Sequence, residues 1–224
     1  MLALTIAACL FIPPPQLHIL FLGNSHTASN DVPGMVRQML ETDGSKRTVT
    51  TRMIIHGFLE DQAQNVATRR ELASGTWDVV VLQGAKLSSS HKFKYPHDGA
   101  IEIAKLAKRS GARVLIYAEW PRKGWAERDY ILDEYGQIAK AAKVDIVPIP
   151  IVWDRVLYRK PELPMWSSDG NHAAPLGSYL AAVCLYFAID GNRKPIPTWR
   201  PAFANAATAS LIGTEARAVD LISE

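Results

Sequence analysis

Cysteine is scarce in this 224-residue sequence, which contains only Cys9 and Cys184. Cys9 belongs to an apolar leader, whereas Cys184 belongs to the apolar stretch YLAAVCLYFAI near the other end of the chain. Two cysteines in such different contexts do not form the framework of a disulfide-stapled domain. Cys184 is more simply explained as a small buried hydrophobic residue.

A surplus of charge of one sign is also lacking. The formal net charge is +3, and the lysines and arginines are scattered rather than gathered in a stripe, so the electrostatic footprint of a nucleic-acid-binding protein is weak and we predict no nucleic-acid partner. Dinucleotide-binding and P-loop glycine fingerprints are missing too, and we predict no cofactor. His91, His97 and Asp98 lack the paired spacing of a metal site; they are better explained as a polar loop, and we predict no metal.

No apolar run is long enough to span a bilayer as a helix. The leader and proline spacer over residues 1–16, MLALTIAACLFIPPPQ, resemble the apolar region of a signal peptide, although no basic residue precedes that region. Ile6-Ala7-Ala8-Cys9 also resembles a lipobox, in which the cysteine is lipidated. We therefore predict export to the periplasm or the exterior, or anchoring through lipid on Cys9, with a cytoplasmic protein as the alternative.

The remaining chain has the composition of one compact domain over residues 17–224, because 48% hydrophobic residues supply a single sizeable core. Strand-like and helix-like stretches alternate, which predicts an α/β fold with a parallel sheet. We expect strands at 17–23, 48–56, 77–83, 112–118 and 144–150. We expect helices at 33–42, 59–73, 98–109, 125–142, 175–189 and 203–223.

Two further features of this pattern bear on function. The second expected strand alternates in polarity, which favours an edge position, whereas the first, third and fourth are near-continuous apolar runs typical of strands covered on both faces. Residues 151–174 show little periodicity, and we interpret them as a long loop. Ligands bind beyond the carboxyl ends of parallel strands, and polar residues follow the strands there: Asn24-Ser25-His26, Gly57, Gln83-Gly84 and Glu119-Trp120.

Ser25 is a candidate nucleophile because it follows the first strand directly. A serine hydroxyl needs a base to take its proton, and the base needs a partner that fixes its tautomer. Of the six histidines, only His172 has an aspartate three residues earlier, Asp169, in a loop before a helix. Taken singly, Ser25 is better explained as a helix cap, Asp169 as a turn former and His172 as a residue near a helix start.

Four segments together resemble the sequence blocks of the SGNH (GDSL-like) hydrolase superfamily: FLGNSHT, the glycine of IIHGF, VVLQGAK and DGNHAAPLGSYLAA. The resemblance spans residues 17–190, and the first and last blocks are the most specific. It implies a flavodoxin-like, five-stranded, three-layer α/β/α fold. It also implies Ser25 as nucleophile, His172 as general base and Asp169 as the acid that orients it. The implied oxyanion hole combines the backbone N–H groups of Ser25 and Gly57 with the side-chain amide of Gln83.

Two residues depart from the commoner pattern of that superfamily. Asn24 stands where aspartate is usual, and Gln83 replaces the asparagine of a Gly-x-Asn-Asp block, as in a branch with a Leu-Gln block. Gln83 can supply the same amide donor, or it can simply tie down a loop. Asn24 is then a residue that bonds the local backbone. Asn24, Trp120 and Trp166 are candidates for contact with substrate, since an aromatic face can stack on a sugar ring.

The sequence thus predicts a serine esterase that hydrolyses a small acyl ester through an acyl-enzyme. The expected substrate is a small molecule or a carbohydrate, with O-acetyl or short acyl groups. The alternative is a non-catalytic carbohydrate-binding or cell-envelope protein on the same fold. Asn24 and Gln83 favour that alternative, whereas the presence of Ser25, Asp169 and His172 together opposes it.

Overall fold

The computed structural model describes residues 14–191 and 194–223. Cys9 and most of the predicted signal segment therefore lie outside the described residues. Within the described ranges, none of the helices combines the length and the apolar character needed to cross a membrane.

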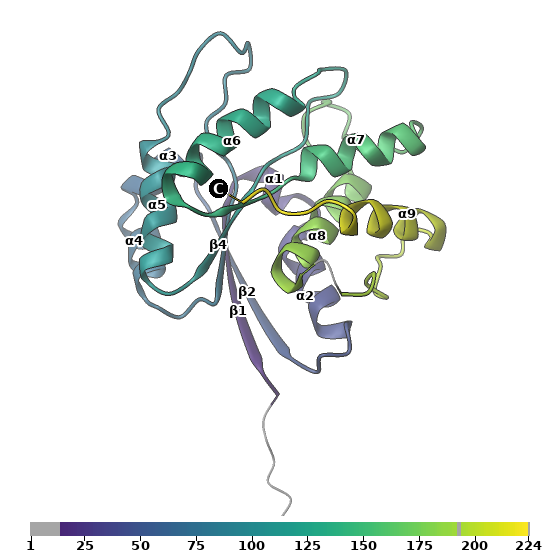
Figure 1. Ribbon diagram of the computed structural model, residues 1–224, viewed down its shortest axis with the longest axis horizontal. Coiled ribbons are helices and arrows are strands. Elements are labelled where there is room, and N and C mark those ends of the chain that lie inside the picture. Colours follow the sequence, from purple (N-terminus) through teal and green to yellow (C-terminus); the bar gives the residue numbers. More distant parts are fainter. Residues whose placement is uncertain (1–13, 192–193, 224) are drawn as a thin grey trace, which may run out of the picture.

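A five-stranded, entirely parallel sheet forms the centre of the domain (Figure 1). Its order is β2-β1-β3-β4-β5, so the second strand lies at an edge, as its alternating pattern predicts. The predicted parallel α/β/α architecture is confirmed. The strands are β1 (Gln16–Gly23), β2 (Thr48–Ile55), β3 (Val79–Leu82), β4 (Arg113–Tyr117) and β5 (Asp145–Val147).

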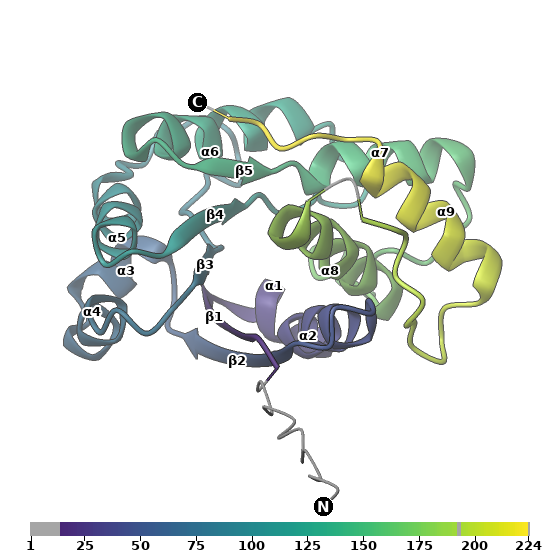
Figure 2. The ribbon, with the colours of Figure 1, turned by 60° about the horizontal axis from the view of Figure 1, so that its bottom comes forward.

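Helices cover both faces of the sheet, and Figure 2 shows the two outer layers on either side of the strands. Successive residues of β1 point to opposite faces, so Ile19 and Phe21 join one core while Leu20 and Leu22 join the other. The core on the Ile19 face includes residues of α2 (Val32–Thr42), α7 (Ile149–Arg159), α8 (Pro175–Asp190) and α9 (Ala206–Arg217). The core on the Leu20 face includes residues of α3 (Leu59–Gln64), α4 (Val66–Ala73), α5 (Asp98–Arg109) and α6 (Arg128–Ala142).

The expected loop over 151–174 is wrong in its first part, because α7 occupies Ile149–Arg159. Ile149, Val152, Trp153 and Val156 recur at helical spacing and are buried on one face. The prolines at its start hid this periodicity, although a proline is tolerated in the first turn of a helix. The expected helix over 59–73 is also divided, since Asn65 ends α3 and caps α4 by accepting a hydrogen bond from Thr68 N.

A buried polar group, the His97 cluster, joins three helices on the Leu20 face. His97 precedes α5; its Nδ1 lies 3.3 Å from Glu60 Oε1 on α3, and its Nε2 lies 3.0 Å from Glu134 Oε2 on α6. Hydrogen bonds with Glu60 and then Glu134 raise the pKa of His97, against the effect of burial. The histidine therefore acts as a bridge between helices rather than as part of a loop.

The strand order reverses at β1, because the chain moves from β1 to β2 on one side and then to β3 on the other. In open parallel sheets the crevice at such a switch point is the usual ligand site. The short helix α1 (Ser25–Ala28) begins at this point. The loops that follow β3 and β4 open at the same edge of the sheet.

Candidate active site

Ser25 is placed by a sharp exit from β1. The strand ends at Gly23, and Asn24 then caps α1 by accepting a hydrogen bond from His26 N at 3.0 Å. A Cβ at position 23 would lie 2.4 Å from Thr27 Oγ1 and 2.9 Å from Gln83 Oε1, so only glycine fits where the chain turns. The apolar run therefore ends in Gly-Asn-Ser because a tight turn lifts an exposed serine above the strand.

The side chains of Ser25, His172 and Asp169 form a continuous hydrogen-bonded row. The Ser25 hydroxyl lies 2.8 Å from His172 Nε2, and His172 Nδ1 lies 2.5 Å from Asp169 Oδ2. The other carboxylate oxygen, Oδ1, accepts hydrogen bonds from the backbone N–H groups of Asn171 (2.9 Å) and His172 (3.0 Å). The Asp169 side chain thus folds its own turn and presents one oxygen to the imidazole. Residues 147 positions apart in the sequence meet in this row.

The charge on Asp169 follows from these contacts. The hydrogen bond from His172, together with those from the two backbone N–H groups, lowers the pKa of the carboxyl to about 2. An ionised carboxylate can only accept, so it holds the proton of a neutral imidazole on Nδ1. Nε2 is left as the acceptor for the serine hydroxyl, which is the arrangement that a general base requires.

Two backbone N–H groups near Ser25 are unused. Those of Ser25 and Gly57 have no hydrogen-bond acceptor among the described residues, and both residues line the cleft described below. Gly57 has a φ of +58°, and a Cβ there would lie 2.7 Å from Asp61 Oδ2. Both features favour glycine, so the weak sequence signal at this position has a clear structural reason.

Gln83 does not reach the cleft, contrary to the expectation that its amide is an oxyanion donor. Its side chain is completely buried. Its Oε1 accepts hydrogen bonds from Asn24 N (3.1 Å) and Thr27 Oγ1 (2.8 Å), and its Nε2 donates to Glu119 Oε2 (2.7 Å). In this arrangement Gln83 ties the turn after β1 to the end of β4, which is the alternative role considered from the sequence.

A second row of polar side chains, Glu119, His26 and Asn171, lies beside the first. It was not predicted from the sequence, although His26 directly follows the candidate nucleophile. His26 Nδ1 lies 3.5 Å from Glu119 Oε2, and Asn171 Nδ2 lies 3.3 Å from His26 Nε2. The His26 ring stacks on Trp120 with ring centroids 5.0 Å apart. Trp120 Nε1 in turn donates to the backbone oxygen of Asn171 at 2.9 Å. This row holds the turn that carries His172 against the ends of β1 and β4.

A cleft of about 640 Å³ opens over these groups. Asn24 and Trp120 line it, as expected of substrate contacts, but Trp166 does not. Trp166 faces away because its Nε1 donates to Pro121 O at 2.8 Å and its ring packs edge-on against Trp153. The other lining residues are Ser25, His26, Gly57, Phe58, Ala85, Leu87, Ser88, Ser89, Glu119, Arg122, Glu127, Tyr130, Ile131, Asp169, Asn171 and His172.

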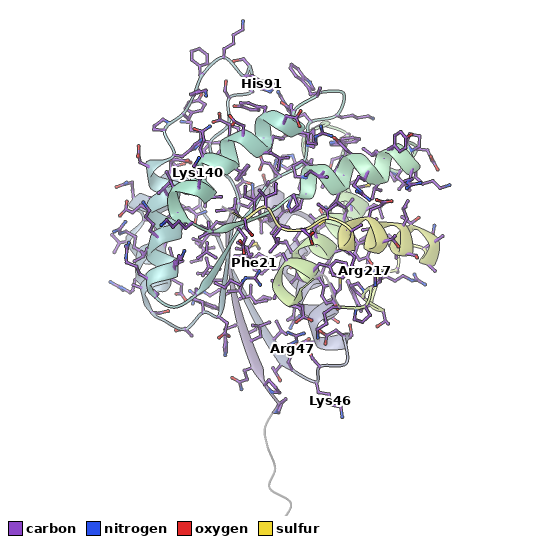
Figure 3. All side chains as sticks on the ribbon, in the orientation of Figure 1. Phe21, Lys46, Arg47, His91, Lys140 and Arg217 are labelled. Carbon is purple, nitrogen blue, oxygen red and sulfur yellow. The ribbon has the colours of Figure 1, made fainter. Side chains whose placement is uncertain are left out.

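The loop between β3 and α5 closes one side of the cleft. His91 Nε2 lies 2.8 Å from Glu127 Oε1, and Arg122 Nη2 donates to Ser89 O at 2.7 Å. Figure 3 places His91 at the end of the molecule opposite Lys46. No three histidine, cysteine, aspartate or glutamate side chains in the described part of the chain are grouped to hold a metal ion.

Comparison with known proteins supports this fold by shape rather than by sequence. No protein-family model matches the sequence, and no curated protein sequence matches it. Among solved structures, a protein from Slackia heliotrinireducens assigned to the SGNH hydrolases aligns with a TM-score of 0.60 and 23% identity, covering 78% of this chain and 99% of its own.

Two other solved structures are similar in shape. A DUF4886 family protein from Bacteroides uniformis aligns with a TM-score of 0.65 and 16% identity, covering 91% of this chain and 94% of its own. The family 3 carbohydrate esterase of Clostridium thermocellum aligns with a TM-score of 0.60 and 15% identity, covering 78% and 96%. The sequence blocks and these structural alignments agree: the chain has the SGNH hydrolase fold.

Proposed function

We propose that the protein is a serine esterase in which Ser25 is the nucleophile, His172 the general base and Asp169 the residue that orients the base. One observation carries this proposal: the Ser25 hydroxyl lies 2.8 Å from His172 Nε2 while Asp169 holds Nδ1 of the same ring. A serine that only caps a helix, or an aspartate that only forms a turn, would not require these two hydrogen bonds to His172. Binding alone would not require them either, which weighs against the non-catalytic alternative.

The proposed reaction has two steps. In the first, His172 Nε2 takes the hydroxyl proton as Ser25 Oγ bonds to the ester carbonyl carbon, and the carbonyl electron pair moves to the oxygen. The intermediate collapses, the bond to the alcohol oxygen breaks, and the imidazolium gives its proton to the leaving alcohol. In the second step, His172 activates water in the same way, and the acyl group leaves as a carboxylic acid. Asp169 stays ionised throughout and stabilises the imidazolium.

We propose that the oxyanion is held by the backbone N–H groups of Ser25 and Gly57. Their unused state supports this, because preformed donors stabilise charge as it develops without further rearrangement. Gln83 has a supporting role, since it accepts a hydrogen bond from Asn24 N and so fixes the peptide chain next to Ser25. The hole then consists of two donors rather than three.

We propose a carbohydrate O-acetyl ester or another short acyl ester as the substrate. The cleft has the size of a small-molecule site. Apolar residues such as Leu87 and Ile131 lie on its wall together with polar groups such as Asn24 and Asn171. One protein of similar fold is a carbohydrate esterase, and this likeness supports the carbohydrate assignment.

The test is hydrolysis of p-nitrophenyl acetate by the wild type, Ser25→Ala and Ser89→Ala. Ser89 is a matched control because it is an exposed serine that lines the same cleft. We expect Ser25→Ala to lower kcat/KM by more than about 10³-fold and Ser89→Ala to leave it nearly unchanged. A wild-type rate equal to that of Ser25→Ala would contradict the proposal and favour the binding protein.

A further inference from the structure

We propose that Trp125 and a small hollow beside the cleft form a subsite for a neutral sugar ring, which belongs to the alcohol part of the substrate. The inference rests on the proposed esterase function, which it deepens by naming residues that recognise the alcohol. Nothing in the proposed chemistry at Ser25 uses Trp125. Its conformation therefore needs a separate explanation.

Trp125 is exposed, yet it is held in a fixed position. The Trp125 residue is 54% exposed, whereas Trp77, Trp120 and Trp153 are buried. Its backbone N–H donates to Arg122 O at 3.0 Å, and the guanidinium carbon of Arg122 lies 4.3 Å from the indole centroid. The His91 ring approaches it edge-on at 6.0 Å. An aromatic surface that is already immobilised loses little conformational entropy when a ligand packs on it.

Arg122 is itself fixed, so the support of the indole is rigid. Its Nε donates to both carboxylate oxygens of Glu127, at 2.9 and 3.1 Å, and its Nη2 donates to Ser89 O at 2.7 Å. Glu127 also lies 2.8 Å from His91 Nε2. These contacts connect the loop after β3, the loop after β4 and the start of α6 around the indole.

A hollow of about 260 Å³ lies next to Trp125. Besides Trp125 it is lined by Pro121, Ala126, Glu127, Arg128, Asp129 and Asp154. Arg128 Nε lies 2.9 Å from Asp129 Oδ1, and its Nη1 lies 3.2 Å from Asp154 Oδ2. Arg128 thus pairs with both aspartates, while Arg122 pairs with Glu127. Three carboxylates face two guanidinium groups, so the site disfavours an anionic ligand.

The chemistry of this hollow fits a sugar better than an acyl chain. The apolar C–H face of a sugar ring packs on an indole, while carboxylate oxygens accept, and guanidinium groups donate, hydrogen bonds to its hydroxyls. An acyl chain would remove water from Asp129, Asp154 and Arg128 without offering them hydrogen bonds, which costs free energy. The size of the hollow suits one ring.

The hollow adjoins the cleft through shared residues. Glu127 lines both, and Arg122 lines the cleft while it contacts the indole. A ligand whose ester lies at Ser25 can therefore extend past the Arg122–Glu127 pair onto Trp125. The sugar that carries the ester would occupy the cleft, and a neighbouring sugar of the same chain would occupy the hollow.

The kinetic test compares Trp125→Ala with the control variant Tyr158→Ala. Tyr158 is another aromatic residue, it is 87% exposed, and it lines neither the hollow nor the cleft. The substrates are p-nitrophenyl acetate and O-acetylated mono- and trisaccharides of xylose, mannose, glucose and N-acetylglucosamine. For at least one trisaccharide we expect Trp125→Ala to raise KM about tenfold with kcat nearly unchanged. Values for p-nitrophenyl acetate and the monosaccharides should stay within about twofold, and Tyr158→Ala should match the wild type throughout.

A binding measurement separates failure of this inference from failure of the proposed function. The wild type and Trp125→Ala are titrated with the four unacetylated trisaccharides by calorimetry. Binding that Trp125→Ala weakens supports the subsite even if no ester is hydrolysed. Ester hydrolysis without any effect of Trp125→Ala on trisaccharide KM or affinity overturns the subsite and leaves the esterase proposal intact.

Discussion

Replacing Asp169 by asparagine tests the proposed division of labour within the row of three side chains. Asparagine keeps an oxygen that can accept hydrogen bonds from the backbone N–H groups of Asn171 and His172, so the turn is preserved. Its amide nitrogen, however, takes the place of Oδ2, which lies 2.5 Å from His172 Nδ1 in the wild type. An N–H donor at that place forces Nδ1 to become the acceptor and moves the imidazole proton to Nε2. Nε2 then cannot take the proton of Ser25.

The expected size of the effect follows from this tautomer change and from the exposure of the carboxyl. Fixing the wrong tautomer in a serine triad lowers kcat by about 10⁴-fold where the acid is buried. The Asp169 side chain is 48% exposed, so water can partly replace it and allow the productive tautomer. We therefore expect kcat/KM for p-nitrophenyl acetate to fall by about 10³-fold.

The assay needs a check on folding and on pH. Asp133→Asn, an exposed aspartate on α6, is the matched control and should keep wild-type activity. Because the pKa of Asp169 is lowered to about 2, its carboxylate stays ionised over the working range of the assay. Asp169→Asn with an unchanged melting temperature and activity within about tenfold of the wild type would refute the reasoning.

Three further predictions concern stability. A Cβ at Gly177 would lie 2.3 Å from Met165 O, whereas one at Gly136 would meet nothing within 4 Å. In urea unfolding, Gly177→Ala should therefore lower the free energy of unfolding by about 1–3 kcal/mol, and Gly136→Ala should raise it by about 0.5–1 kcal/mol. Equal effects of the two substitutions would contradict the packing argument. Because its glutamate partners raise the pKa of His97, its stabilising contribution is complete below the unfolded value of about 6.5 and is lost as pH rises through the raised pKa. The melting temperature should fall over that interval in the wild type but much less in His97→Gln, and identical slopes would exclude the cluster as the cause. Gln83→Leu should lower both kcat and the free energy of unfolding, the latter by about 2–3 kcal/mol. A loss of kcat at unchanged stability would instead indicate that Gln83 is an oxyanion donor.

The sequence predicted those parts of the fold that depend on local pattern. The strands β1, β3 and β4 are buried over most of their length and are therefore nearly continuous apolar runs, and the alternating β2 lies at the edge. The helix α7 was missed because prolines at its start resemble loop composition, although its buried face has regular helical spacing. Its burial depends on α8 and α9, which come later in the chain.

The candidate site was predictable only from several residues taken together. Ser25, Asp169 and His172 each have an ordinary explanation alone, but the His172–Asp169 spacing and the four sequence blocks singled them out, and the structure brings the three side chains together. The role of Gln83 was not predictable, since an amide at a strand end can point into the cleft or into the protein, and the choice depends on Thr27 and Glu119. The His26 row also joins separate loops, and no local pattern reveals such contacts.

Covalent labelling by a fluorophosphonate tests the central claim most directly, because the reagent phosphonylates a serine whose hydroxyl is activated by a base. The wild type, Ser25→Ala and His172→Ala are treated, digested and examined by mass spectrometry for the modified peptide. The account predicts one adduct, on Ser25, that is absent from Ser25→Ala and strongly reduced in His172→Ala. An adduct on Ser88, Ser89 or Ser90, or the absence of any adduct on folded wild-type protein, would contradict it.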